Sequence, residues 1–166
     1  MIDKIISEGQ TGADRAALDV AIELGIPHGG WLPKGRKTEA GRLPAKYQLS
    51  EMPTDSYQQR TEQNIIDSDG TLIISRGELS GGSEYTRQMA EKHGKPWIHV
   101  DASRMSIDAA VQLVSAWING SETKILNVAG PRASEHRKIY DTTKRLLAVL
   151  IKMMSVGNRE SQDAPG

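Results

Sequence analysis

Residues 4–24 read KIISEGQTGADRAALDVAIEL, in which a short apolar run leads into a glycine-rich turn and then into a periodic segment. The apolar run over Lys4–Ser7 predicts a buried strand. From Ala13 to Leu24, apolar residues recur three and four positions apart, which predicts a helix whose small side chains can pack closely on a sheet. The stretch therefore predicts a strand, a turn and a helix in direct succession.

The same order repeats along the chain. Further strands are expected over 71–75, 97–100 and 125–128, and helices over 60–68, 85–94, 107–118 and 139–154. Because the strands are continuously apolar, both faces of their sheet must be covered, which indicates a single three-layer α/β domain with a mostly parallel sheet. We assign residues 1–154 to this domain and expect residues 155–166 to form a disordered C-terminal tail. Residues 31–60 show no period, which is typical of a functional loop or of short elements that the pattern does not reveal.

The composition excludes several functional classes. The chain has 166 residues, with 21 basic and 21 acidic side chains and no cysteine. The balanced charge disfavours a generally basic nucleic-acid-binding protein or a polybasic membrane protein. The lack of cysteine removes disulfides, thiolate metal sites and thiol nucleophiles. We recognise no signal peptide and no membrane span, and so expect a cytoplasmic protein.

Three turns that follow predicted strands are rich in glycine and small hydroxyl residues. They are GQTG at 9–12, GGS at 81–83 and AGPRAS at 129–134. In a parallel sheet such turns meet at the carboxyl edge, where ligands bind. Each exposes unpaired N–H groups at the start of a helix, and these attract anions such as phosphate. Helix capping alone explains one such turn, but three at one edge favour a phosphate-binding pocket.

Basic side chains near these turns could hold the anion. The stretch WLPKGRK at 31–37 is the densest basic part of the chain, and Lys34 and Arg36 in it could clamp a multiply charged ligand. A solvated basic loop is the alternative. Arg15, in the first turn of the first predicted helix, is either a site residue or a surface arginine. The polar stretch 60–64 either begins a helix or lines the pocket, and the sequence alone does not decide.

The sequence contains no recognisable catalytic motif. The turn at 9–12 lacks the Gly-Lys-Ser/Thr ending of a Walker A loop and does not match Gly-x-Gly-x-x-Gly. The four histidines are scattered, which argues against a metal site, and no Gly-x-Ser-x-Gly elbow marks a serine hydrolase. We therefore expect a binding protein rather than an enzyme.

From about Lys4 to Leu150 the sequence resembles one known family. The motifs that carry the resemblance are GQTGADRAALD at 9–19, GGWLPKGR at 29–36, RT-x-x-N at 60–64, DSDGTLI at 67–73, SGG at 80–82 and LNVAGPR at 126–132. They look like those of the molybdenum cofactor (molybdopterin) carrier proteins, which are related to the nucleotide-binding phosphoribohydrolases often mislabelled lysine decarboxylases. The resemblance implies a Rossmann-like fold and a homo-oligomer, with a tetramer expected.

The resemblance also implies that the protein binds, protects and delivers the molybdenum cofactor, held by its pterin and its terminal phosphate, without catalysing a reaction. The cofactor's own dithiolene chelates the metal, so no protein metal ligand is needed. The implied partners are the cofactor and the proteins that synthesise or receive it; nucleic acid and membrane are not expected. The residues expected to bind the cofactor are Gly9, Gln10, Thr11, Gly12, Arg15, Lys34, Arg36, Gly81, Gly82, Ser83, Arg132 and Ser134.

Glu8 departs from the family pattern, in which Ser-Gly-Gly-Gln-Thr-Gly is expected and a glycine stands at this position. A carboxylate beside an anion site repels the ligand, and a glycine at this position could be needed for a positive φ. Either Glu8 points away from the site, or the site is weakened or altered.

Two other functions stay open. In the related phosphoribohydrolases the second loop reads Pro-Gly-Gly-x-Gly-Thr-x-x-Glu, and its final glutamate is catalytic. In this chain Glu84 replaces the third glycine and Gln88 stands where the glutamate would be. Because an amide cannot act as a carboxylate base, a nucleoside-monophosphate phosphoribohydrolase is disfavoured. A nucleotide-binding module without chemistry is the other alternative.

Overall fold

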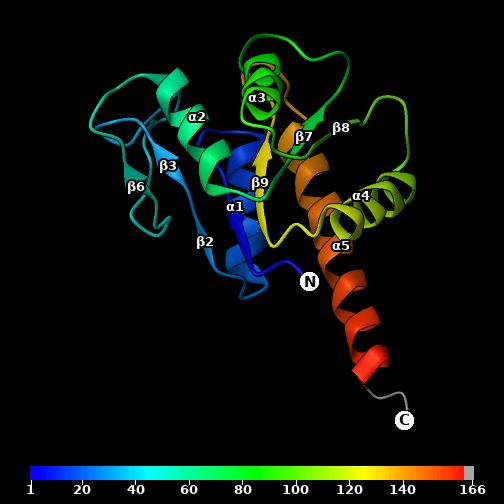
Figure 1. Cartoon of the computed structure of the whole chain (residues 1–166). Helices are drawn as coiled ribbons and strands as arrows, with labels where there is room; N and C mark the ends of the chain where they lie inside the picture. Colours follow the sequence, from blue (N-terminus) through cyan, green and yellow to red (C-terminus); the bar gives the residue numbers. More distant parts are fainter. Residues whose placement is uncertain (163–166) are drawn as a thin grey trace.

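A parallel five-stranded sheet organises the computed structural model, which describes residues 1–162 (Figure 1). The strand order is β2-β1-β9-β7-β8, and every neighbouring pair is parallel. Because β9 lies between β1 and β7, the turns that follow these three strands meet at one edge. The strands of the sheet are β1 (Lys4–Ile6), β2 (His28–Gly29), β7 (Gly70–Ser75), β8 (Trp97–Asp101) and β9 (Ile125–Ala129).

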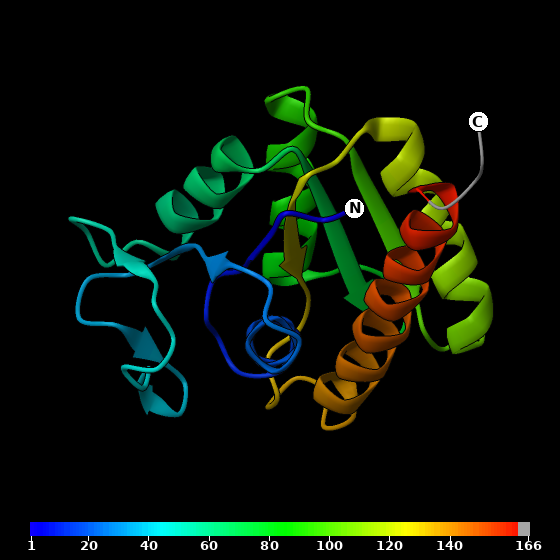
Figure 2. The same cartoon turned by 90° about the horizontal axis from the view of Figure 1, so that it is seen from below.

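Helices cover both faces of this sheet, as Figure 2 shows from below. The helices are α1 (Ala13–Glu23), α2 (Tyr57–Asp67), α3 (Gly81–Lys92), α4 (Ile107–Ser121) and α5 (Ile139–Gln162). α1 and α5 lie on one side, and α2 and α3 on the other. The main apolar core includes Leu72, Val100 and Val128 of the sheet together with side chains of α1, α4 and α5. The predicted three-layer α/β fold with a parallel sheet is therefore confirmed.

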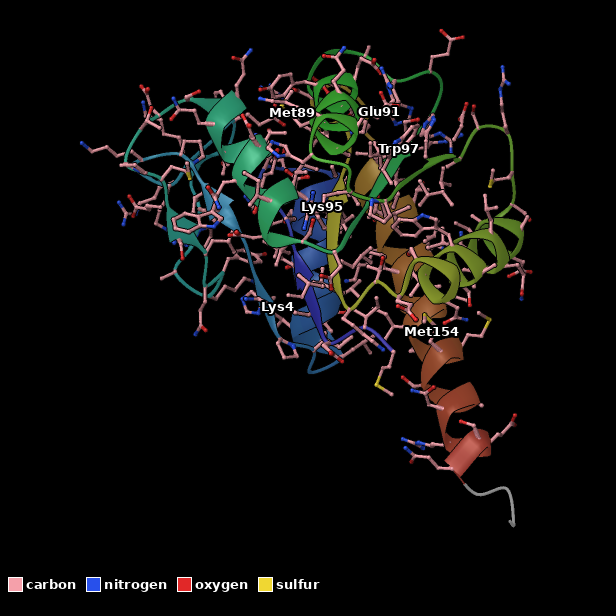
Figure 3. The ribbon with its side chains drawn as sticks, viewed as in Figure 1. Lys4, Met89, Glu91, Lys95, Trp97 and Met154 are labelled. Carbon is pink, nitrogen blue, oxygen red and sulfur yellow. The ribbon has the colours of Figure 1, made fainter. Side chains whose placement is uncertain are left out.

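The opposite face of the sheet, which α2 and α3 cover, is more polar. Asn127 Nδ2 donates to Thr71 Oγ1 across two strands at 3.2 Å. Lys95, beneath α3 in Figure 3, donates from Nζ to the Ser68 carbonyl oxygen at the end of α2, 2.9 Å away. The Arg87 guanidinium of α3 lies 5.8 Å from the centre of the Trp97 ring. The helices on this side bury a mixture of polar and apolar residues, namely Arg60, Thr61, Asn64 and Ile65 of α2 and Thr86 and Ala90 of α3.

Residues 30–56 form a small subregion beside the sheet, which we call the 30–56 segment. It contains β3 (Trp31–Leu32), which pairs in parallel with β6 (Ser50–Glu51), and the hairpin of β4 (Lys37–Thr38) and β5 (Gly41–Arg42). Strands of two residues are too short to show a period, which is why the sequence did not predict them. A second apolar cluster holds the segment against α1, formed by Leu18, Leu32, Leu43, Tyr47 and Leu49.

The last helix is longer than expected. α5 continues to Gln162, so the predicted disordered tail from residue 155 is wrong for residues 155–162. Helix-forming residues such as Arg159 and Glu160 extend the helix without an apolar face, whereas the prediction relied on apolar residues alone. Residues 163–166 of that prediction lie outside the described part of the chain.

Candidate functional site

A pocket of about 260 Å³ lies at the carboxyl edge of the sheet, between the start of α1 and the helices α2 and α3. Such a volume is near the lower end of the range for small-molecule sites, ~300–1,000 Å³. The turns after β1, β7 and β9 all contribute to its wall, as the parallel topology requires. Its lining residues are Glu8, Gln10, Asp14, Tyr57, Gln58, Arg60, Thr61, Gly81, Gly82, Ser83, Tyr85, Thr86, Ala129, Gly130, Arg132 and Glu135.

A buried ion pair forms one wall of the pocket. Arg60 Nη2, from α2, lies 2.7 Å from Glu8 Oε2, from the turn after β1, and both side chains are less than a tenth exposed. The Arg60 guanidinium also lies over the Tyr57 ring, 4.9 Å from its centre. Burying two charges is costly unless they are paired, so each of these residues holds the other in place.

Asp14, in the first turn of α1, is the second buried carboxylate of the pocket and is 3% exposed. Its Oδ2 accepts a hydrogen bond from the Gln10 N–H at 3.2 Å. Burial, followed by the negative charge of Glu8, raises the pKa of Asp14 well above its ordinary value, against the opposing effect of Arg60. Within residues 1–162, Asp14 Oδ1 and the Nε and Nη1 atoms of Arg60 are buried without a hydrogen-bond partner. Such unpaired atoms are rare in folded proteins and call for an explanation.

The start of α3 is open toward the pocket. A side-chain atom added at Gly81 or Gly82 would meet nothing within 4 Å. The Ser80 side chain does not cap the helix, and the N–H groups of Ser83 and Glu84 turn back to the Ser80 carbonyl oxygen at 3.2 and 3.3 Å. These two N–H groups are thus occupied, and the N–H groups of Gly81 and Gly82, together with the helix dipole, make this end of the pocket attractive to an anion.

The glycines of the first turn have a different role. A side-chain atom at Gly12, where φ is +77°, would lie 2.4 Å from the Pro131 carbonyl oxygen, and one at Gly9 would meet Leu49 and Leu43. These glycines permit close packing between parts of the protein. They do not line the pocket.

Glu39 lies at the tip of the β4–β5 hairpin, and its carboxylate accepts hydrogen bonds from the first turn and from the loop between β9 and α5. It accepts hydrogen bonds from the Thr11 hydroxyl and from the backbone N–H (3.1 Å) and hydroxyl of Ser134. Its own N–H donates to Gln10 Oε1 at 2.9 Å. Although burial opposes the change, the bonds from Ser134 and Thr11 hold the pKa of Glu39 below its ordinary value. A protein carboxylate thus takes donors that the sequence suggested for a bound anion.

The structure brings some of the expected site residues together and places others elsewhere. Arg36 donates to four backbone carbonyl oxygens of the 30–56 segment, and Lys34 is exposed. The Arg15 guanidinium lies 5.1 Å from the centre of the Tyr47 ring. The expected residues that line the pocket are Gln10, Gly81, Gly82, Ser83 and Arg132; those that do not are Gly9, Thr11, Gly12, Arg15, Lys34, Arg36 and Ser134.

Glu8 does not point away from the site, and it has no positive φ. Arg60 neutralises its charge. The sequence left the role of stretch 60–64 undecided, because nothing in it connects residues 52 positions apart. One signal was present in the sequence: Glu8 is an acid where the family pattern has glycine, and Arg60 of the RT-x-x-N motif is a basic residue that could pair with it.

The positions that distinguish the phosphoribohydrolases lie outside the pocket lining. The Glu84 carboxylate pairs with Arg87, and Gln88 Nε2 donates weakly to Glu84 Oε1 at 3.4 Å. Arg87 also pairs with Glu91 at 2.8 Å. The side chains at 84 and 88 are therefore engaged on the surface of α3.

Two further observations bear on the kind of site. Among residues 1–162, no three His, Cys, Asp or Glu side chains are grouped so that they could hold a metal ion. Over the same residues, no helix combines the length and the apolar composition that a membrane crossing needs.

Comparisons with known proteins agree with the fold. A family model described as the circularly permutated YpsA SLOG family matches residues 5–151. A solved structure from Syntrophus aciditrophicus SB, named "Putative molybdenum carrier protein", is 56% identical, has a TM-score of 0.89, and covers 90% of this chain and 94% of its own. No curated protein matches the chain.

Proposed function

We propose that this chain, which belongs to the circularly permuted YpsA SLOG family, binds and carries a phosphorylated pterin of the molybdenum cofactor type and catalyses no reaction on it. The name of the similar structure from Syntrophus aciditrophicus SB supports the choice of ligand. The composition of the pocket supports the binding, because it combines an anion-attracting end with unpaired polar atoms deeper inside.

The observation that carries the proposal is that the open start of α3 and the Arg132 side chain line the same pocket. In this proposal the terminal phosphate lies between the N–H groups of Gly81 and Gly82 and the Arg132 guanidinium. The Arg132 side chain is 43% exposed, and its Nε lies 3.5 Å from Glu135 and 4.0 Å from Glu39, which leaves its two terminal nitrogens for a ligand. The ring system lies against Tyr57 and Tyr85, which also line the pocket. Arginine suits the phosphate because its planar group can form two parallel hydrogen bonds.

The carried metal imposes no demand on the protein. The dithiolene of the cofactor supplies its own sulfur ligands, so a chain without cysteine fits this cargo. A carrier needs a protected binding site and a means of release. We expect the protein to form a homo-oligomer, and light scattering of the purified protein tests that expectation.

The test is an anaerobic titration of the protein with molybdenum cofactor, comparing Arg132→Gln with Lys34→Gln. Removing the charge of Arg132 should weaken binding about tenfold, equivalent to about 1.4 kcal/mol, a typical value for one charge-assisted hydrogen bond. Lys34→Gln removes a basic residue that the sequence favoured but that lies outside the pocket lining, so its affinity should match that of the wild type. Equal loss in both variants, or no saturable binding at all, contradicts the proposal.

AMP is the second ligand of the same experiment. Release of ribose 5-phosphate from AMP without cofactor binding would make the protein a phosphoribohydrolase. Binding of AMP without turnover and without cofactor binding would make it a nucleotide-binding module. The positions of Glu84 and Gln88 outside the pocket lining favour the expectation that no ribose 5-phosphate appears.

A further inference from the structure

The deep part of the pocket contains hydrogen-bonding atoms of both kinds. Asp14 Oδ1 is an acceptor, and Arg60 Nε and Nη1 are donors; all three are buried and have no partner within residues 1–162. Both side chains are more than nine-tenths buried, and both line the pocket. A buried polar atom without a partner costs about 1–3 kcal/mol, so a ligand that pairs with these atoms recovers that cost.

The two groups are held in fixed positions. Gln10 N–H binds Asp14 Oδ2, which leaves Oδ1 as the free oxygen. Glu8 binds Arg60 Nη2, and the Tyr57 ring lies beneath the guanidinium. Each residue is therefore held by one turn of the chain, since the partners Glu8 and Gln10 are two positions apart in the turn after β1, and both side chains line the same pocket.

A ligand edge with a carbonyl acceptor beside N–H donors can satisfy both groups, and an amino group next to the ring N–H gives the carboxylate a second donor. We propose that Asp14 and Arg60 select a ring with a 2-amino-4-oxopyrimidine edge, whose N–H groups donate to Asp14 Oδ1 and whose carbonyl oxygen accepts from Arg60. This inference rests on the proposed function, in which a pterin is the ring that is bound. The N–H groups of such a ring also favour the ionised form of this carboxylate, whose pKa is raised by burial.

The experiment uses two ligands that differ in one group. Pterin carries an amino group at position 2, and lumazine carries an oxo group there, so lumazine places an acceptor against Asp14. Wild-type protein should bind pterin about tenfold more tightly than lumazine, because one unpaired buried contact is worth about that factor. Direct titration of the protein with each ligand by isothermal calorimetry near neutral pH measures both affinities and does not depend on cofactor binding. Equal affinities in the wild type overturn the inference.

Asp14→Asn exchanges the acceptor for a donor. Because Gln10 N–H still requires an oxygen, the new amide should present its nitrogen to the pocket. The preference should therefore reverse in favour of lumazine by a similar factor. The control is Asp108→Asn, the same change at an exposed position in the first turn of α4, which should keep the wild-type preference. An unchanged preference in correctly folded Asp14→Asn overturns the inference.

The outcomes separate this inference from the proposed function. If the cofactor binds but pterin and lumazine are not distinguished, the carrier proposal stands and the roles of Asp14 and Arg60 are rejected. If pterin is preferred but the cofactor does not bind, the ring selection stands and the carrier proposal fails. Guanosine monophosphate presents the same edge as pterin, and its binding in that second case identifies a nucleotide as the ligand.

Discussion

The guanidinium groups of Arg36 and Arg60 are both withdrawn into the protein, but their surroundings differ. Arg36 donates from all three of its nitrogens to carbonyl oxygens of Leu43, Pro44, Tyr47 and Leu49, at 2.7–3.3 Å. Arg60 has one ion pair and two nitrogens without a partner in the described chain. The 30–56 segment uses its arginine to hold itself together, whereas the arginine of the pocket leaves part of its hydrogen-bonding capacity unused by the described residues.

The comparison teaches how to interpret a basic stretch. Basic residues are dense in the sequence around Arg36, yet the Arg36 guanidinium binds carbonyl oxygens of its own segment. Arg60 is an isolated basic residue in a polar helix, and it lies in the pocket. A charged residue points to a ligand when its partners within the protein do not saturate it, and sequence density does not reveal that.

The largest effect is expected when the pocket loses its ion pair. Glu8→Ala leaves Arg60 buried without a partner, which should lower the free energy of unfolding by about 3–5 kcal/mol. Urea denaturation measures the loss. Glu62→Ala is the matched control on α2, because Glu62 pairs with Lys92 and His93 near the surface, where such pairs contribute less than about 1 kcal/mol. Losses of similar size in the two variants would show that the buried ion pair contributes no more to stability than a surface pair does.

A smaller effect is expected in the 30–56 segment. Arg36→Met should lower the free energy of unfolding by about 2–3 kcal/mol, because four carbonyl oxygens lose a charged donor but can be partly hydrated. The cofactor affinity of the folded variant should stay at the wild-type value, since Arg36 does not line the pocket. Arg42→Met, an exposed change in β5 of the same segment, is the control. If the affinity falls in Arg36→Met and not in Arg42→Met, Arg36 contributes to cofactor binding.

The smallest effect has the opposite sign. Burial raises the pKa of Asp14 in the folded protein, so its contribution to stability is present at low pH and is lost as the pH rises through that pKa. Asp14→Asn removes the ionisation and should make the protein more stable than the wild type near neutral pH. The difference should shrink toward acid pH, and thermal unfolding over a pH series checks it. A variant that is less stable at every pH would show that Asp14 is satisfied in the free protein.

The longer helices and strands could be predicted from the sequence because the spacing of their apolar residues repeats several times within each element. The strand over 71–75 and the helix over 107–118, for example, both appear in β7 and α4 at nearly the expected bounds. The elements of the 30–56 segment have two residues each and no period to detect. The extension of α5 beyond residue 154 was missed because its last turns lack an apolar face.

The site was only partly predictable, for a different reason. Gly12 and Gly82 look alike in the sequence, but Gly12 permits contact with Pro131 and Gly82 faces open space. Only at Gly12, with its φ of +77° and its close approach to Pro131, does the backbone require a glycine. The contact between Glu8 and Arg60 depends on how α2 crosses the turn after β1, which no local pattern encodes.

The position of β9 has a consequence for synthesis of the chain. β9 is the last strand to be made, yet it lies in the middle of the sheet and alone connects β1 with β7. A growing chain can assemble the pair β1–β2 and the pair β7–β8, but the native sheet cannot close before residues 125–129 leave the ribosome. Until then two strand edges stand unpaired, the kind of surface on which incomplete chains associate. Chaperones that bind nascent chains should therefore protect this protein most just before β9 emerges from the ribosome.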